Sequence, residues 1–263
     1  MQNKETALVT GASSGLGAAL AEELASRGYD LILTARSKIS MDELAARLRF
    51  RPGVNVTVVE ADLSQHDGVT DLTGKLDAQG LNPTVVVNNA GFGLNERFVD
   101  HDCDRLAAML RLNVLSLSEL SRFYGQRMAT AGRGHILLVA SVAAYQPDPL
   151  MAAYGASKAY VLSLGEALHV ELSPRVRVTV FSPGFMETGF SAVSGFEPTR
   201  ATIRTALSPK KVARIGLDAL FRGRPTVVAG GMNRAMVFVA RLLPRMFVAR
   251  QVAKAAGASL PAK

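Results

Sequence analysis

The sequence has one cysteine, no tryptophan and few aromatic residues, which make up 6% of its 263 residues. The single cysteine, Cys103, excludes an internal disulfide framework and is typical of a reducing compartment. No apolar run approaches the roughly 18 residues of a membrane-spanning helix. The first residues also lack the charged, apolar and cleavage regions of a secretory signal. We therefore expect a cytoplasmic protein.

Acidic residues are missing from the last part of the chain. Residues 219–263 contain eight Lys and Arg and no Asp or Glu, whereas residues 1–218 contain 22 bases and 22 acids, so the net charge of +8 belongs to the tail. The sequence shows no basic patch interleaved with aromatic residues, as in single-strand nucleic-acid sites. The charge therefore does not predict a nucleic-acid partner.

Short apolar runs alternate with longer amphipathic segments. Seven runs rich in β-branched residues predict strands at Thr6–Thr10, Leu31–Ala35, Val54–Glu60, Thr84–Asn88, His135–Ala140, Val176–Phe181 and Thr226–Val228. Helices are expected near residues 15–28, 41–50, 65–79, 102–130, 154–172 and 208–222. The alternation predicts an α/β fold, a Rossmann-type doubly wound parallel sheet of about seven strands with helices on both faces.

The first expected strand leads into the glycine-rich turn TGASSGLG and then a helix. Glycines let the backbone approach a pyrophosphate closely, and a helix N-terminus supplies free N–H groups. The Gly-x-x-x-Gly-x-Gly spacing differs from the common dinucleotide fingerprint, but its place between strand and helix favours a nucleotide site. The candidate cofactor-binding residues of this turn are Gly11, Ser13, Ser14, Gly15, Leu16 and Gly17.

Arg36 and Ser37 follow the second expected strand, at the point that faces the adenosine ribose in dinucleotide folds. An acid there would bind a free 2′-hydroxyl, whereas an arginine can pair with a 2′-phosphate. Because Arg36 is present and no acid is, we predict NADP(H) rather than NAD(H) as the cofactor. A solvated arginine at a strand end is the alternative interpretation.

Two further strand ends carry small or polar residues. Asp62 and Leu63 follow the third strand, where they can reach the adenine, and Asn89, Ala90 and Gly91 follow the fourth, where amides can tie neighbouring strands together. Ligands of open α/β sheets gather at the carboxyl ends of the strands. We therefore add these five residues to the cofactor site, and we predict no metal site.

Tyr154 and Lys158 lie four residues apart, on one face of an expected helix. A phenol ordinarily has a pKa of about 10, which a neighbouring ammonium would lower. Ser141 lies 13 residues earlier, at the end of the fifth strand, where its hydroxyl can hold a carbonyl oxygen. Asn113 falls inside an expected helix, where asparagine is unfavourable, so either a bound water or a tolerated helical Asn would explain it.

Together these motifs resemble the short-chain dehydrogenase/reductase family over about residues 5–230. The motifs are TGASSGLG, Asp62-Leu63, NNAG, Asn113, Ser141, YGASK and Pro183-Gly184. The resemblance implies a catalytic tetrad of Asn113, Ser141, Tyr154 and Lys158, of which Asn113, Tyr154 and Lys158 also contact the cofactor. It further implies that Pro183, Gly184 and Thr188 contact the nicotinamide and pyrophosphate half. The family's usual Ser-Ser pair reads Ala140-Ser141 here, which keeps the catalytic member.

The resemblance implies an NADP(H)-dependent oxidoreductase that interconverts a carbonyl and an alcohol. Hydride would pass to the carbonyl carbon while Tyr154 protonates the oxygen and Ser141 bonds it. Lys158 would lower the pKa of Tyr154 and hold the nicotinamide ribose, and Asn113 would orient a water. A cofactor-binding sensor without turnover is the alternative, and the complete tetrad argues against it. A homodimer or homotetramer is implied by the resemblance alone.

We expect residues 1–230 to form one dinucleotide-binding catalytic domain, with a substrate loop at about residues 183–207. A pocket for a bulky or hydrophobic ketone would be lined by Phe92, Phe185, Met186, Phe190, Val193 and Phe196. The same residues can equally pack a lid or a core.

Residues 231–263 are expected to form a basic amphipathic tail. Arg234, Arg241 and Arg245 fall on one helical stripe, and Pro244 should bend that helix. Such a helix can lie on a membrane surface, where the protein would reduce lipid-like substrates. It can also cover the active site or contact a partner subunit, and we favour these two over the membrane.

Overall fold

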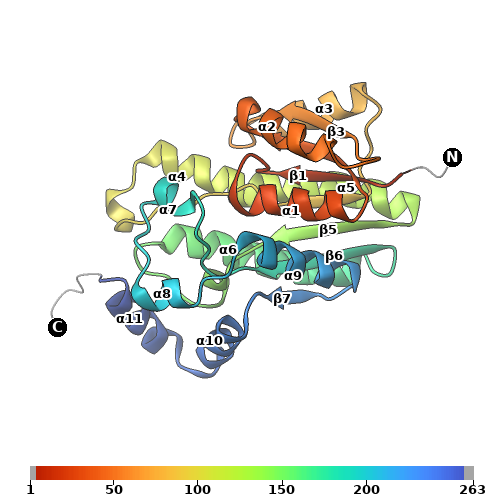
Figure 1. Cartoon of the computed structure of the whole chain (residues 1–263). Coiled ribbons are helices and arrows are strands. Elements are labelled where there is room, and N and C mark those ends of the chain that lie inside the picture. Colours follow the sequence, from red (N-terminus) through yellow and green to blue (C-terminus); the bar gives the residue numbers. More distant parts are fainter. Residues whose placement is uncertain (1–3, 258–263) are drawn as a thin grey trace.

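A parallel sheet runs through the molecule in the computed structural model, which describes residues 4–257 (Figure 1). The strands are β1 (Thr6–Thr10), β2 (Asp30–Ala35), β3 (Val56–Glu60), β4 (Val85–Asn88), β5 (Gly134–Val139), β6 (Val176–Ser182) and β7 (Thr226–Val228). They pair in parallel in the order β3-β2-β1-β4-β5-β6-β7. The predicted fold class is confirmed.

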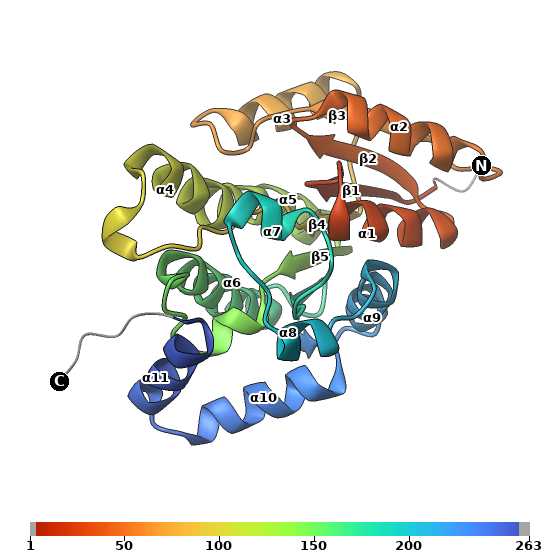
Figure 2. The same ribbon diagram turned by 60° about the vertical axis from the view of Figure 1, so that its left-hand side comes forward.

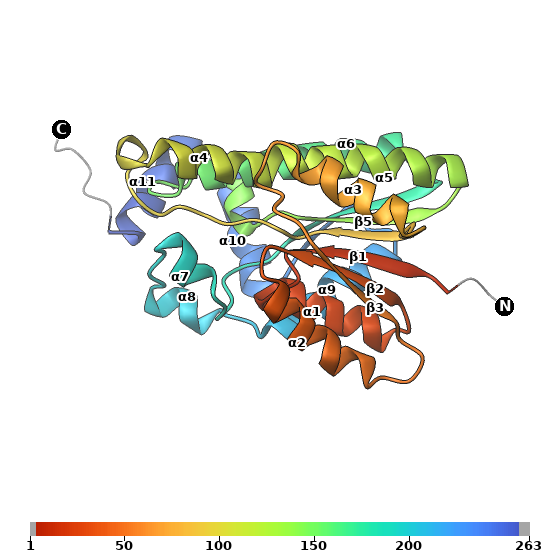
Figure 3. The ribbon, with the colours of Figure 1, turned by 90° about the horizontal axis from the view of Figure 1, so that it is seen from above.

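Helices cover both faces of the sheet (Figure 3). On one face lie α1 (Gly15–Ser26), α2 (Lys38–Arg49) and α9 (Pro209–Phe221), and on the other lie α3 (Gly68–Ala78), α5 (Leu117–Ala131) and α6 (Ala152–Glu171). Alternate residues of β1 enter the two layers, Ala7 and Val9 on the α1 side and Leu8 on the α5 side. Because both faces are buried, the strands read as continuous apolar runs.

The remaining elements lie at the carboxyl edge of the sheet and in the tail. They are α4 (Cys103–Leu110), α7 (Phe190–Ser194), α8 (Arg200–Arg204), α10 (Gly231–Leu242) and α11 (Arg245–Ala255), with 3-10 turns at Phe98–Asp100 and Val142–Tyr145. The segment from 183 to 207, expected to be irregular, thus contains the two short helices α7 and α8.

Most predicted boundaries agree with the structure, and the differences have local causes. β3 begins at Val56 rather than Val54 because Gly53, with a φ of +75°, turns the chain before it. α2 begins earlier than expected because the Ser37 hydroxyl accepts a hydrogen bond from the Ser40 N–H and caps the helix. The helix predicted over 102–130 is interrupted, since a π-helical turn at Arg111–Ser116 separates α4 from α5.

The prediction of one bent tail helix is wrong. α10 ends at Leu242, Leu243 is extended, and α11 begins at Arg245 directly after Pro244. Proline excludes the helical conformation from the residue before it and is well tolerated at a helix start, so it separates two helices here. The expected arginine stripe is therefore divided between α10 and α11, and residues 258–263 of the tail lie outside the described residues.

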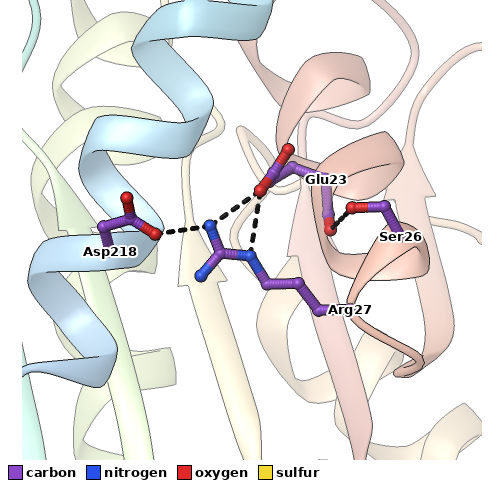
Figure 4. A network of polar contacts seen from close by, with 4 residues as sticks. All are labelled: Glu23, Ser26, Arg27 and Asp218. Atoms are coloured by element: carbon purple, nitrogen blue, oxygen red, sulfur yellow. Dashed lines mark hydrogen bonds and ion pairs between the residues drawn. The ribbon is translucent and has the colours of Figure 1, made fainter.

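An arginine links the first helix to α9 (Figure 4). The Nη2 of Arg27 donates to Glu23 and to Asp218, each at 2.7 Å, and its Nε donates to Glu23 at 3.0 Å. The guanidinium also lies over the ring of Phe221. These contacts hold α9 against α1, the helix that follows the glycine-rich turn.

The strand order reverses between β1 and β4, which are neighbours in the sheet although two strands separate them in sequence. In open α/β sheets this switch point opens a crevice at the carboxyl ends of the strands. Within residues 4–257, no helix has the length and apolar character needed to cross a bilayer.

Candidate active site

The glycine-rich turn is built for close approach of the backbone. Gly11 and Gly15 have left-handed φ values of +66° and +56°, which residues with a Cβ rarely adopt. A Cβ on Gly17 would collide with the carbonyl oxygen of Gly11. Ser14 precedes α1 without capping it through its side chain, so the first-turn N–H groups keep their capacity to bind an anion.

The turn is fixed to the neighbouring strand at the switch point. The Thr10 hydroxyl accepts hydrogen bonds from the N–H groups of Asn89 and Ala90, both at 2.9 Å, and donates to the carbonyl of Val87 at 3.2 Å. The Asn89 amide donates to the Thr10 carbonyl at 2.9 Å. The expectation that the amides after β4 tie strands together is confirmed for Asn89.

Arg36 and Asp62 lie together at the ends of β2 and β3. Arg36 is exposed, and its charge acts on the carboxylate of Asp62. Burial alone would raise the pKa of Asp62, but hydrogen bonds from Ser64 and Gln65 and the charge of Arg36 hold it below its usual value. An exposed cation is thus available where a 2′-phosphate is expected.

Three of the predicted cofactor residues have side chains engaged elsewhere. The Ser37 hydroxyl caps α2. The side chains of Leu16 and Leu63 are buried in the two core layers. Contacts of Leu16 and Leu63 with a ligand would therefore be made by their main chains.

Asn113 sits inside the π-helical turn, fully buried. Its Nδ2 donates to the Phe92 carbonyl at 2.9 Å and to the Ser157 hydroxyl at 3.1 Å, and its Oδ1 accepts from the Phe92 N–H at 3.2 Å. A Cβ on Gly91 would lie 2.8 Å from this Oδ1 and 3.4 Å from the Lys158 Nζ. Asn113 therefore joins the chain after β4 to α6, and its expected role in orienting a water stays a prediction. Single π-turns of this kind are frequent at functional sites.

The tetrad residues converge on the end of β5. Ser141 lies just beyond β5, and its hydroxyl acts to lower the pKa of the Tyr154 phenol. Lys158 is 4% exposed, and its Nζ donates to the Val139 carbonyl at 2.9 Å and lies 5.8 Å from the centre of the Tyr154 ring. The structure thus brings together the four residues that the sequence predicted.

The expected effect of Lys158 on Tyr154 is not found. Burial raises the pKa of Tyr154 to about 12, the Ser141 hydrogen bond opposes this, and the charge of Asp148 adds to it. Burial also lowers the pKa of Lys158 to about 8. The ammonium is turned to the Val139 carbonyl, so desolvation dominates the Tyr154 phenol.

An apolar cluster lies beside Tyr154. The Tyr154 and Phe190 rings are 5.5 Å apart, and Phe92 and Phe196 pack against the same cluster. Phe185 contacts Phe196 with a ring separation of 5.9 Å. Four of the six expected pocket residues thus lie at this site.

The other two expected pocket residues lie elsewhere. Met186 packs against the core layer formed by α1 and α9, in agreement with the alternative that it is a core residue. Val193 is 50% exposed on α7.

The segment after β6 closes over the glycine-rich turn. Thr188 would meet a Cβ on Gly15 at 3.3 Å, so the two ends of the expected cofactor site are adjacent. The buried Pro183 accepts a hydrogen bond from the Val142 N–H at 3.1 Å. Gly184 leaves no room for a Cβ because the Asn233 amide packs against it.

A family model described as short chain dehydrogenase matches residues 5–195. The chain belongs to the short-chain dehydrogenase family. It is an oxidoreductase of that family, and the resemblance read from the motifs is confirmed.

Relatives of this short-chain dehydrogenase agree with its fold. An uncharacterized oxidoreductase of Staphylococcus saprophyticus is 32% identical over 221 residues, covering 84% of this chain and 92% of the relative. A Sphingobium yanoikuyae short-chain dehydrogenase in complex with NADPH is 31% identical with a TM-score of 0.80, covering 90% and 94% of the two chains. The bulky-bulky ketone specific alcohol dehydrogenase from Comamonas testosteroni is 30% identical with a TM-score of 0.77, covering 92% and 93%.

Several residues of this short-chain dehydrogenase site were missed from sequence. The Ser157 hydroxyl accepts a hydrogen bond from the Asn113 amide, and the charge of Asp148 raises the pKa of Tyr154. Asn95 ties the loop after β4 to α7, since its N–H donates to Ser194 at 2.9 Å and its amide to Gly195 at 3.1 Å. Ser157 lies inside the YGASK motif and could have been found there, whereas Asn95 and Asp148 lie in loops without a local signal.

Proposed function

We propose that this short-chain dehydrogenase uses NADP(H) to interconvert a bulky, hydrophobic ketone and its alcohol. The observation that carries the proposal is the position of the Tyr154 phenol, on which the Ser141 hydroxyl acts and which is flanked by the aromatic cluster of Phe92, Phe190 and Phe196. A proton donor and an apolar surface thus occupy one site at the carboxyl edge of the sheet.

The residues present fit a dinucleotide. Gly11 and Gly17 have no space for a Cβ, and a Cβ on Gly15 would meet Thr188, so the backbone of this turn approaches its neighbours without intervening side chains. Arg36 supplies a cation suited to a 2′-phosphate. When bound, NADP(H) would supply or accept the hydride, and the Sphingobium relative that binds NADPH supports this choice.

The chain's own residues would handle the proton and the oxygen. With a pKa raised to about 12, Tyr154 keeps its proton at neutral pH, and it would pass this proton to the ketone oxygen as negative charge develops there. The Ser141 hydroxyl would bond the same oxygen and orient it. Lys158, buried beside the tyrosine, would hold the cofactor ribose with its ammonium.

The aromatic cluster supports a large apolar substrate. Phe190 and Phe196 come from the segment between β6 and α9, which the loop after β4 holds through Asn95. Aromatic side chains offer a broad apolar contact area without charged groups. The Comamonas alcohol dehydrogenase, named for bulky-bulky ketones, is consistent with this proposal.

Oxidation of NADPH and, separately, of NADH should be measured against small, aromatic and bulky aliphatic ketones. We expect turnover with NADPH that rises with the apolar bulk of the ketone. Tight NADPH binding without turnover of any ketone would favour a sensor, and a preference for NADH would contradict the proposed cofactor.

A further inference from the structure

The two tail helices present one covered face and one uncovered face. Asn233 and Val237 of α10 and Val248, Ala249 and Ala253 of α11 are buried. The Arg241 guanidinium lies 5.1 Å from the centre of the Tyr145 ring, beside the active-site edge. The inner face therefore packs on the domain, in agreement with one of the roles expected for the tail.

The outer face carries an unusual set of large apolar side chains. Eight of them are between 39% and 69% exposed: Met232, Met236, Phe238, Val239, Leu242, Leu243, Met246 and Phe247. Met232, Met236 and Val239 follow each other by four and three residues, which places them on one stripe of α10. No part of the described chain covers this face, and such a group of exposed apolar side chains is typical of an interaction surface.

The charges of the two tail helices have one sign. Arg234, Arg241, Arg245, Arg250 and Lys254 are exposed, and residues 219–263 contain no acid. Within residues 4–257, none of these five cations forms a salt bridge with a carboxylate. The surface is thus apolar and basic without neutralising groups.

This charge pattern distinguishes between the partners that the outer face could bind. A second copy of the chain, joined through the same face, would bring unpaired arginines together without an acid to compensate them. A nucleic acid would meet methionine and leucine side chains, which carry neither a positive charge nor a hydrogen-bond donor for its phosphates. An anionic lipid surface matches both features, since apolar groups enter the acyl boundary while cations meet the headgroups.

We propose that the outer face of α10 and α11 docks on an anionic membrane surface. Figure 2 shows both helices lying outside the two helical layers that cover the sheet. The inner side of α10 touches the active-site edge at Tyr145 and Gly184, so docking would bring that edge close to the lipid. The exposure of the outer face thus favours the membrane role that sequence alone ranked below lid and subunit contact.

Co-sedimentation of the full chain with vesicles tests the proposal. Vesicles of phosphatidylglycerol and phosphatidylcholine are compared with vesicles of phosphatidylcholine alone. We expect at least a tenfold preference for the anionic vesicles at low salt, reduced at high salt. The variants Phe238→Ser/Phe247→Ser and Arg245→Glu/Arg250→Glu should each weaken binding about tenfold or more.

Matched controls come from the opposite part of the molecule. Phe50→Ser removes a phenylalanine that is 87% exposed at the end of α2. Arg51→Glu/Arg133→Glu reverses two exposed arginines outside the tail. Both controls should bind vesicles like the wild type, and thermal unfolding should show that all four variants are folded.

Three results would overturn the proposal. The first is a wild-type chain that stays in the supernatant with anionic vesicles, or tail variants that bind as well as the wild type. The second is a loss of dimers in Phe238→Ser/Phe247→Ser by sedimentation velocity without lipid, which would assign the face to a partner subunit. The third is binding to double-stranded DNA, in place of vesicles, that both tail variants lose.

Discussion

At the scale of single residues, burial shifts the pKa values of three groups at the site. Burial raises the pKa of Tyr154 to about 12 and that of Asp148 to about 6, and lowers that of Lys158 to about 8. At neutral pH the phenol is protonated, the carboxyl is largely ionised and the amine is largely charged. Spacing alone placed Lys158 beside Tyr154 but did not indicate the rise in the phenol pKa, because burial depends on contacts that a sequence does not display.

Asp148→Asn should stabilise the protein at alkaline pH. The folded-state pKa of Asp148 is raised, so its ionised form opposes folding above about pH 6, and this opposition disappears as pH falls below the ordinary value of the carboxyl. We expect a gain on the order of 2 kcal/mol at about pH 8 and only about 0.5 kcal/mol at about pH 4. Urea unfolding at both pH values measures it, with the exposed Asp104→Asn as control. An equal gain at both pH values would contradict the burial of an ionised Asp148.

Arg36→Ser tests the cofactor preference. Loss of the guanidinium removes a charge-assisted, bidentate phosphate contact, so kcat/KM for NADPH should fall about 10- to 100-fold while that for NADH changes little. The kcat/KM of Arg36→Lys for NADPH should lie between those of the wild type and Arg36→Ser, because lysine keeps the positive charge but cannot form the bidentate contact of a guanidinium. Lys38→Ser is the matched control, since that cation is paired with Asp42 at 2.6 Å. An equal fall in kcat/KM with both cofactors would show that Arg36 does not bind the 2′-phosphate.

At the scale of elements, the strongest local signals were the most reliable. The continuous apolar strands and the glycine-rich turn between β1 and α1 carry their information within a few residues, and both are confirmed. The split tail could have been suspected from Pro244, which breaks helices. The contact of Thr188 with Gly15 and the packing of Met186 in the core depend on tertiary arrangement, which periodicity does not specify.

The π-helical turn at Arg111–Ser116 shows an intermediate case. Asn113 was correctly singled out as unfavourable in a helix, and the helix is indeed distorted there. Its partners Phe92 and Ser157 come from other elements. The sequence therefore indicated the position of the irregularity but not its form.

Gly17→Ala and Gly74→Ala should change the free energy of unfolding in opposite directions. A Cβ at Gly17 collides with the Gly11 carbonyl oxygen, whereas a Cβ at Gly74 meets nothing within 4 Å in α3. We expect Gly17→Ala to lower the free energy of unfolding by about 2 kcal/mol or more and to weaken NADPH binding. Gly74→Ala should raise it by about 0.5–1 kcal/mol. Urea unfolding and NADPH fluorescence measure both, and a neutral Gly17→Ala would contradict the close packing of the turn.

At the scale of the whole molecule, the sheet brings the expected cofactor-binding residues and the tetrad residues to one edge. β1, β2 and β3 end at the glycine-rich turn, Arg36 and Asp62, and β5 ends at Ser141, next to Tyr154 and Lys158 of α6. The parallel order with its reversal between β1 and β4 makes these ends neighbours. The fold class follows from the alternation of strands and helices, while the uncovered face of α10 and α11 could be seen only once both helices were placed.

Tyr154→Phe tests the central claim most directly, because it removes one hydroxyl and leaves the ring beside Phe190. NADPH affinity and turnover of a bulky ketone are measured on the same preparation. We predict an NADPH Kd within about threefold of the wild type and a kcat lowered about 1,000-fold. A variant that turns over within about tenfold of the wild type would contradict Tyr154 as the proton donor.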